Sequence, residues 1–190
     1  SLGDNILKDT NSLRSRMINN LNIQSFNFIS DKGFKNNLNY YLKNTITAGK
    51  NNVEYDSSPE VKFSNIIEMQ SSFPLVKMDE NYLSYINPKL SLRVNPSSMK
   101  FYGDDKRKIN SDNIFNINRL GLIDTLETGQ NLTLGIDYKK EKLNNINKFF
   151  EVKLGTVLRR KVNEDIPSSS TINKKKSNYF GIIKNNFNDN

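Results

Sequence analysis

The 190-residue chain carries 28 lysine and arginine residues against 20 aspartate and glutamate residues, a formal net charge of +8, and contains no histidine, cysteine or tryptophan. This composition excludes a Ser-His-Asp triad, a Cys-His nucleophile and a zinc site of thiolates or imidazoles, whereas an enzyme that uses carboxylates as acid and base remains possible. Hydrophobic residues make up 35% of the chain, below the ~45–50% apolar share of an ordinary globular domain, and 31 asparagines favour turns and loops.

No apolar run approaches the ~20 residues of a membrane helix, and none follows a basic start as in a signal peptide. The sequence begins at Ser1 rather than at methionine and ends in the polar run from Asn185 to Asn190. We therefore expect residues 1–190 to be a fragment of a single domain in a longer protein.

Alternation of apolar and polar residues with period two, which is typical of strands, recurs along the chain. In residues 14–30 the apolar phase changes between Ile23 and Phe26, which predicts a bulge or a bend. Further alternations follow at residues 37–48, 61–69 and 90–94, and a strand without assigned faces is expected within residues 177–187.

The strongest strand signal runs from Asn131 to Lys139, and a second long alternation runs from Phe150 to Arg159. In the first of these, the apolar positions are Leu132, Leu134, Ile136 and Tyr138. The opposite positions are polar, which predicts a face that lines a wet interior. The residues expected on that lumen-facing side are Asn131, Thr133, Asp137, Lys139 and Lys153.

Together these patterns predict about eight strands, several of them ten residues or longer. Strands of soluble domains average ~5–6 residues, whereas membrane-crossing strands need ~9–11. Short connections and long polar connections also alternate along the chain, as they do in outer-membrane barrels. We therefore predict an all-β fold, an antiparallel meander that forms a curved section of a transmembrane β-barrel. The alternative is a soluble antiparallel sheet with one solvated face.

The longest connection, from Asn95 to Glu127, is too long for an ordinary loop unless it is packed or functional. Its segment from Asp112 to Leu120 mixes apolar residues with asparagine and arginine. We expect this extracellular loop to form a helical turn or a packed lid that closes the mouth of the barrel from outside.

The sequence contains no convincing catalytic or metal-binding motif. The carboxylate pairs Asp104-Asp105 and Glu164-Asp165 lie in expected loops, where solvated charge is favoured over catalysis. An EF-hand calcium loop and a glycine-rich phosphate loop are both missing. We expect a protein that is not an enzyme and that uses neither a metal nor a cofactor.

Two short basic clusters, residues 106–108 and 174–176, also lie in expected long loops. Solvated loop charge is the favoured interpretation, and contact with anionic lipid head groups comes second. Nucleic acid is disfavoured as a partner because the clusters are separated and do not follow one groove.

One stretch of the chain resembles a known family. Residues 112–120 read D-N-I-F-N-I-N-R-L and precede Gly121 and Asp124, and the strand L-T-L-G-I follows at residues 132–136. This order is similar to the barrel domain of the LptD family, the lipopolysaccharide-assembly outer-membrane proteins also called organic solvent tolerance proteins. In that family a D-N-L-F-x-x-N-R-F stretch precedes a strand reading L-T-x-G-L.

The resemblance extends from Ser71 to Asp189 and keeps the order of the family's elements. The L-G-T-V strand at residues 154–157, the P-S-S-S-T-I-N stretch at residues 167–173 and the S-N-Y-F-G segment at residues 177–181 resemble later elements of the family. The residues that carry the resemblance are Asn113, Phe115, Asn118, Arg119, Gly121, Asp124, Leu132, Thr133, Gly135, Pro167, Ser169 and Gly181.

The resemblance implies a closed barrel in the cell outer membrane that releases lipopolysaccharide sideways into the outer leaflet. The implied partners are lipopolysaccharide, an LptE-type plug lipoprotein in the lumen, and the periplasmic bridge protein LptA, which a domain outside this chain would contact. Within that family assignment, Lys139 and Lys153 are expected to offset phosphate charge along the path. The alternatives are a passive porin or receptor-type barrel and, in a different class, a soluble β-sheet adhesin or binding module.

Overall fold

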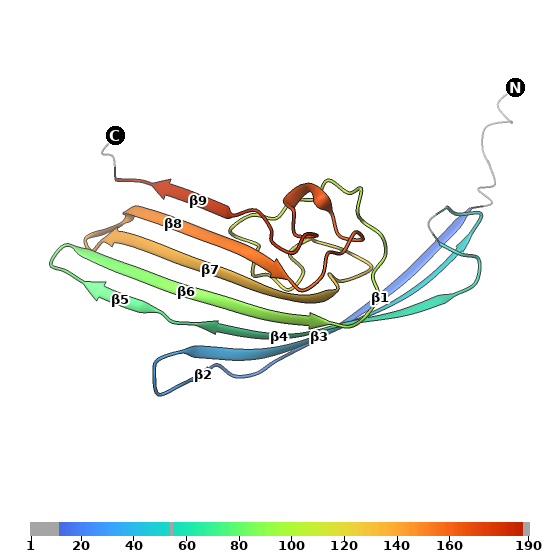
Figure 1. Ribbon diagram of the computed structural model, residues 1–190, viewed down its shortest axis with the longest axis horizontal. Coiled ribbons are helices and arrows are strands. Elements are labelled where there is room, and N and C mark those ends of the chain that lie inside the picture. Colours follow the sequence, from blue (N-terminus) through green and yellow to red (C-terminus); the bar gives the residue numbers. More distant parts are fainter. Residues whose placement is uncertain (1–11, 54, 188–190) are drawn as a thin grey trace, which may run out of the picture.

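The computed structural model describes residues 12–53 and 55–187, which form one antiparallel sheet with almost no helix (Figure 1). Residues 188–190 of the polar C-terminal run lie outside the described residues. The elements are β1 (Leu13–Gln24), β2 (Phe28–Ile29), β3 (Lys35–Lys50), β4 (Glu60–Ser72), β5 (Leu75–Met78), β6 (Tyr82–Asn95), β7 (Gly129–Lys142), β8 (Asn145–Arg159), the 3-10 turn η1 (Ser168–Ser170) and β9 (Phe180–Asn185).

The strand order is β1-β3-β4-β6-β7-β8-β9, with β2 continuing β1 along β3 and β5 continuing β4 along β6. Each long strand therefore pairs with the next one in the chain, which confirms the predicted all-β antiparallel meander. The described residues contain nine strands, against about eight expected, and two of the nine, β2 and β5, are short continuations of β1 and β4. Over residues 12–53 and 55–187 the sheet is open, since β1 and β9 form its two edges and do not pair with each other.

The interruption between β1 and β2 is the irregularity predicted from the change of apolar phase. Gln24 pairs with Asn39 and Phe28 pairs with Asn36, so four steps along the first strand match three along β3. One extra residue is therefore accommodated as a bulge, and the Oγ of Ser25 accepts a hydrogen bond from the free backbone N–H at position 38. The bulge allows Phe28 to lie on the same face of the sheet as Ile23, although their sequence parity differs.

The strands are long, and their connections differ at the two ends of the sheet. β3 has 16 residues and β8 has 15, well beyond the ~5–6 residues of an average strand. The connections at residues 30–34, 79–81 and 143–144 are short and lie at the left in Figure 1. The connections at residues 51–59, 96–128 and 160–179 are long and lie at the other end.

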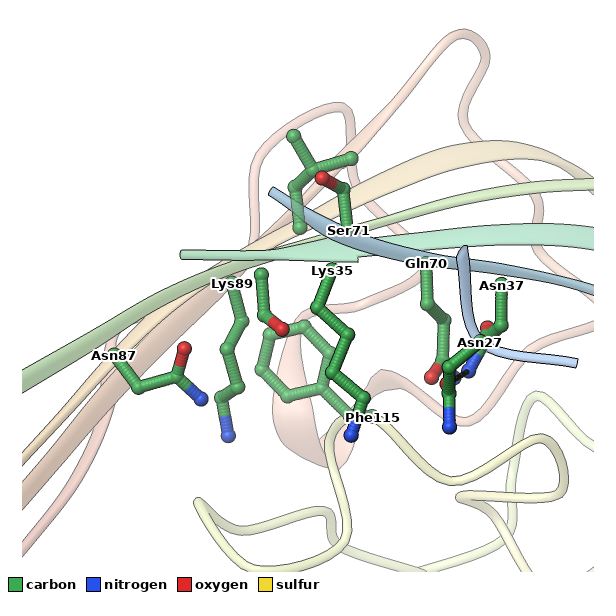
Figure 2. A pocket seen from close by; sticks show the side chains of 10 residues that line it. Asn27, Lys35, Asn37, Gln70, Ser71, Asn87, Lys89 and Phe115 are labelled. Atoms are coloured by element: carbon green, nitrogen blue, oxygen red, sulfur yellow. Dashed lines mark hydrogen bonds between the residues drawn. The ribbon is translucent and has the colours of Figure 1, made fainter. Parts of the chain in front are cut away.

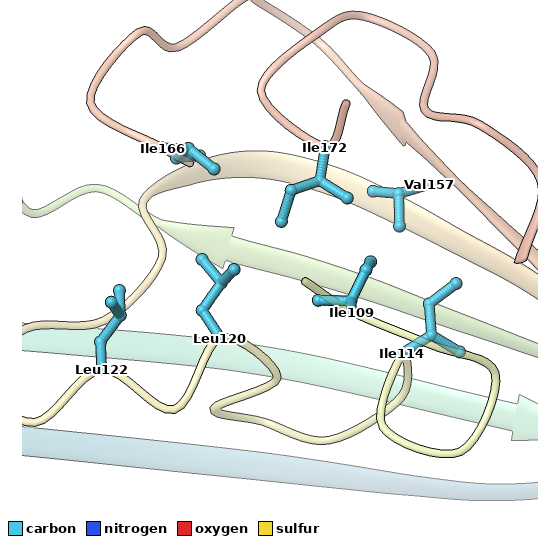
Figure 3. Packing of buried hydrophobic residues seen from close by; sticks show 7 residues of the cluster. All are labelled: Ile109, Ile114, Leu120, Leu122, Val157, Ile166 and Ile172. Carbon is cyan, nitrogen blue, oxygen red and sulfur yellow. The ribbon is translucent and has the colours of Figure 1, made fainter. Parts of the chain in front are cut away.

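Two of the long loops fold back over one face of the sheet and build the main buried apolar cluster (Figure 3). Its members come from residues 96–128, from residues 160–179 and, through Val157, from β8 itself: Ile109, Ile114, Leu120, Leu122, Val157, Ile166 and Ile172. Residues 112–120 thus form turns and no helix, and their apolar side chains pack on the sheet.

In the described ranges no helix is long and apolar enough to cross a membrane.

The loop 96–128 reaches the middle of the strands and does not stop at their ends. A Cβ added at Gly155 would lie 3.1 Å from Ile114, and one added at Gly135 would lie 2.6 Å from the ring of Phe115. Gly135 is at the centre of β7, and Gly155, which pairs with it, lies four residues before the end of β8. The loop therefore covers the face of the sheet, which differs from the expected lid beyond the strand ends.

Candidate functional site

One face of the sheet carries apolar side chains that are exposed. In the register of the strands, one transverse row crosses five strands from β3 to β8 and consists entirely of apolar residues: Leu38, Met69, Leu92, Leu132 and Leu158. The exposed fractions are 51% for Leu38, 43% for Met69 and 46% for Leu92. If this sheet belonged to a soluble protein, the row would be exposed to water, because no other element of the described residues covers it.

The neighbouring row, one residue further along each strand, lies on the opposite face and is polar and buried. It consists of Asn39, Glu68, Arg93, Asn131 and Arg159. Each of these side chains is at most 9% exposed. The sheet therefore places its polar residues inside and its apolar residues outside, which is the reverse of a soluble sheet that packs its apolar face on a core.

The exposed apolar surface extends across the whole sheet and not only along one row. Large contiguous apolar patches on a protein surface mark contacts with a partner or with a membrane. Further exposed members on the strands, from β1 at one edge to β9 at the other, are Met17, Leu21, Ile23, Val61, Phe63, Ile67, Leu90, Leu134, Ile136, Leu154 and Ile183.

On the polar face, a buried charge network holds the two long loops against the sheet. The carboxylate of Glu127 accepts two hydrogen bonds from the guanidinium of Arg119, at 2.6 and 2.7 Å, and one from Arg159. Arg119 also donates to the Oγ1 of Thr133 at 2.9 Å and to the side-chain oxygen of Asn131 at 3.2 Å. The loop 96–128 is thus fastened to β7 and β8 by side chains of both signs.

The second half of the network lies on β4 and β6. Arg93 donates to Glu68 at 2.6 Å and to the backbone oxygen of Phe115 in the loop at 2.6 Å. Ser91 donates to the same Glu68 oxygen as Arg93, Oε1, at 2.6 Å, and Gln70 donates to the other oxygen at 2.9 Å. Three arginines against two glutamates leave the whole network with one net positive charge, and its arginine and glutamate side chains are all at least nine-tenths buried.

The environment of Glu127 keeps this side chain ionised. Burial raises the pKa of Glu127, but the charges and hydrogen bonds of Arg119 and Arg159 outweigh burial and lower the pKa to about 2. A carboxylate this strongly paired and buried stabilises the fold only while its partners remain in place. Its role in the structure is therefore that of a clamp between the loops and the sheet.

Five of the twelve residues that carry the family resemblance lie together in this region. The ring of Phe115 packs over Gly135 of β7, and Arg119 binds Thr133 two residues earlier on the same strand. Asn118 closes a turn by donating to the backbone oxygen of Leu122 at 2.7 Å and accepting from its N–H at 3.0 Å. The resemblance therefore falls on side chains that dock the loop onto β7.

Gly135 is required by this docking, and its replacement by alanine tests the contact. The added Cβ would lie 2.6 Å from the Phe115 ring, so the loop has to shift. We expect Gly135→Ala to destabilise the folded protein by about 1–3 kcal/mol, the usual cost of overpacking. Urea unfolding in detergent would measure this loss, and the same change in a Phe115→Leu background should cost clearly less. Equal costs in both backgrounds would contradict the proposed contact.

Other resemblance residues have local structural positions. Gly121 adopts a positive φ of 62° and its N–H donates to the backbone oxygen of Asn118 at 3.0 Å. Asp124 accepts a hydrogen bond from the hydroxyl of Tyr102, and the side chain of Asn113 accepts one from the N–H of Asn110 at 2.8 Å.

The remaining resemblance residues are spread over the sheet and the second long loop. Pro167 is fully buried before η1, and the exposed Ser169 donates to the backbone oxygen of Asp105 at 3.4 Å. Leu132 lies on the apolar face, and Gly181 of β9 pairs with Leu154. These four residues do not contribute side chains to the charge network.

The five residues expected to face a lumen all lie on the polar face. Thr133 and Asn131 are buried under the loop. Asp137 pairs with Lys89 of β6 at 2.7 Å, and Lys153 pairs with Asp112 of the loop at 3.0 Å. Their charges are thus largely compensated by neighbours on the same face, as is that of Lys139, which pairs with Glu141.

Sequence reasoning did not single out Glu68, Arg93, Glu127 or Arg159, which form most of the network. The available signal was the position of Arg93 and Arg159 in the polar phase of strands whose alternate residues are Leu92, Val94 and Leu158. An arginine on the buried side of a strand is expensive to bury unless it has a carboxylate partner.

Among the described residues there is no group of three or more histidine, cysteine, aspartate or glutamate side chains that could hold a metal ion. The first basic cluster and the first carboxylate pair are in contact, since Arg107 forms an ion pair with Asp105 at 2.9 Å.

A comparison with protein-family models finds no match for the chain, and a comparison with curated proteins finds no significant match.

Proposed function

We propose that this chain is a wall section of an outer-membrane β-barrel that moves lipopolysaccharide into the outer leaflet without covalent chemistry. The observation that carries the proposal is the reversed sheet, in which Leu38, Met69 and Leu92 are exposed while Glu68 and Arg93 in the adjacent row are buried. An apolar exterior and a polar interior are what a barrel needs when lipid surrounds it.

The dimensions of the strands support a transmembrane position. β3, β4, β6, β7 and β8 each have 13 to 16 residues, and a membrane-crossing strand needs ~9–11. The open edges at β1 and β9 leave unpaired backbone groups that cannot face hydrocarbon. In the proposed protein, further strands outside this chain pair with both edges and close the barrel.

Two observations favour a lipopolysaccharide translocon over a passive porin or a receptor-type barrel. The first is the ordered resemblance to the LptD family. Among the residues of this chain that carry it, Phe115 packs on Gly135 and Arg119 binds Thr133. The second is that loops fastened by buried ion pairs cover part of the polar face, which narrows a lumen. In the proposed assembly, an LptE-type lipoprotein occupies the rest of the lumen, and LptA delivers the lipid from the periplasm.

A soluble β-sheet adhesin or binding module is the competing function from another class. Such a protein would need a partner that covers the entire apolar face, from Met17 on β1 to Ile183 on β9. Nothing in the described residues supplies that cover, because the long loops lie on the other face. Lipid covers such a face without any specific partner, and we therefore prefer the membrane barrel.

The test uses the intact protein that contains this chain, produced in Gram-negative cells. A photo-crosslinking amino acid is placed at Lys139 in one variant and at Ile136 in another, which are on opposite faces of β7. The side chain of Lys139 is 39% exposed, so a probe there is accessible. We expect lipopolysaccharide adducts at Lys139 and few at Ile136.

The two positions serve as controls for each other, since they lie three residues apart on one strand and on opposite faces of it. Adducts only at Ile136 would indicate ordinary contact with bilayer lipid and would contradict transport along the polar face. Crosslinking at neither position, in cells that contain the folded barrel, would favour a passive pore.

A further inference from the structure

A cavity opens on the polar face beside the loop 96–128 and next to the Glu68 side of the charge network. Its volume is about 180 Å³, and its walls come from three strands, from Asn27 in the bulged connection before β2 and from the ring of Phe115. In the strand register, Lys35 of β3, Ser72 of β4 and Lys89 of β6 form one transverse row across it. The small side chain of Ser72 leaves the space between the two lysines open.

The two lysines extend from the same side of the sheet, with the Phe115 ring between them (Figure 2). Neighbouring strands are ~4.8 Å apart, so two lysines separated by one strand have backbones about 10 Å apart. Lys89 pairs with Asp137 at 2.7 Å and lies 4.5 Å from the centre of the Phe115 ring. Lys35 has no carboxylate partner among the described residues, so one positive charge at the cavity is uncompensated.

The remaining lining is rich in amides and suited to hydroxyl groups. Asn27, Asn37, Gln70 and Asn87 all line the cavity, and each amide offers both donors and an acceptor. The side-chain oxygen of Asn87 is buried and has no hydrogen-bond partner within the part of the chain that the structure describes. An atom of this kind is costly to leave unpaired, and a ligand hydroxyl would satisfy it.

We propose that this cavity binds a phosphorylated sugar, with the phosphate between Lys35 and Lys89 and the sugar hydroxyls on the surrounding amides. The ring of Phe115 provides an apolar wall against which a face of the sugar packs. A cavity of about 180 Å³ is smaller than the ~300–1,000 Å³ of sites for drug-sized ligands, and it accommodates a single sugar unit. This inference rests on the proposed function, since it gives the polar face a subsite for the head group.

Calorimetric titration of the purified intact protein in detergent tests the subsite with three probes: glucosamine 1-phosphate, glucosamine and inorganic phosphate. We expect glucosamine 1-phosphate to bind more tightly than either of the others, because only it engages the lysines and the amides together. Lys35→Gln should weaken its binding roughly tenfold to hundredfold, the range for a hydrogen bond to a charged group. The matched control is Lys77→Gln on β5, which removes an equal charge at a side chain that is 77% exposed and lies outside the cavity lining.

A second variant, Ser72→Leu, fills the cavity and leaves both lysines unchanged, and it should abolish binding. Unaltered affinity in both Lys35→Gln and Ser72→Leu would overturn the proposal, as would no binding of glucosamine 1-phosphate to the folded protein. Equal affinities for inorganic phosphate and glucosamine 1-phosphate would overturn the sugar assignment. The titration does not depend on transport. If no probe binds in the titration while lipopolysaccharide still crosslinks at Lys139, the subsite is rejected and the proposed function stands.

Discussion

Replacement of Glu127 by glutamine is expected to lower the free energy of unfolding by about 3–5 kcal/mol, the usual cost of breaking a buried ion pair. The amide would leave the guanidinium groups of Arg119 and Arg159 buried without their shared carboxylate. The loop 96–128 would then lose its main attachment to β7 and β8. Urea unfolding of the folded protein in detergent measures the change.

The matched control is Glu60→Gln, which makes the same chemical change in a solvent-exposed pair. Glu60 lies 2.9 Å from Lys62, and both side chains are about half exposed. Exposed pairs contribute about 0–1 kcal/mol, so this variant should be close to the unmodified protein. Similar losses for Glu60→Gln and Glu127→Gln would contradict the view that Glu127 acts as a clamp.

The contribution of Glu127 should also depend on pH in a defined direction. Its pKa is about 2 in the folded protein, against an ordinary value of 4.5. A lowered pKa means that the stabilisation is complete above about pH 4.5 and is lost as the pH falls toward 2. The stability difference between the unmodified protein and Glu127→Gln should therefore shrink over this interval, and a constant difference would contradict the assigned pKa.

Introduction of arginine at Ile136 is expected to prevent stable insertion of the protein into the membrane. Ile136 lies near the centre of β7 on the exposed apolar face. An arginine on the lipid face of a barrel costs about 2–4 kcal/mol at the midplane and about 0–1 kcal/mol near the interfaces. The amount of folded protein in outer-membrane fractions of cells, assessed by its migration in gels without heating, gives the readout.

The matched control is Ile146→Arg, the same substitution at the start of β8 beside the short connection at residues 143–144. Ile146 is 68% exposed and lies at the strand end, where the interfacial cost applies. We expect this variant to reach the membrane normally. If the face of the sheet met water, both arginines would be tolerated equally, and that result would favour the soluble alternative.

The alternation of residue types was sufficient to predict strands, their antiparallel order and the bulge near Ile23. Period-two patterns are local, and each short connection leaves a strand little choice but to pair with its neighbour. The prediction that residues 131–139 separate an apolar face from a polar face rests on the same local rule. The bulge after Gln24 and the break between β4 and β5 divide two long strands, and neither division could be counted from the alternation alone.

The break between β4 and β5 shows a limit of local reasoning. Pro74 lies between these strands, and Pro88 lies opposite on β6, where the backbone oxygen of Pro88 accepts a hydrogen bond from Phe73 at 3.0 Å. Neither proline can donate to the ladder, so regular pairing lapses there. Each proline was visible in the sequence, but their proximity on neighbouring strands depends on the register.

The contacts that the long loops make could not be predicted from the sequence pattern. The segment around Phe115 was expected at the strand ends, and the structure places it over the middle of β7, where Gly135 leaves room for the ring. The partners of Arg93 and Arg159 also follow from register and loop path, since Glu68 lies 25 residues from Arg93 and Glu127 lies 32 from Arg159.

The sequence by itself determined the strands and the division of each strand into an apolar and a polar side, because alternation is a property of neighbouring residues. Only the tertiary structure decided that the polar side is buried and the apolar side exposed, because that outcome depends on which face the loops cover. The loops cover the polar face because buried arginines such as Arg119 need carboxylates such as Glu127, and these meet only after the chain has folded back on its own sheet.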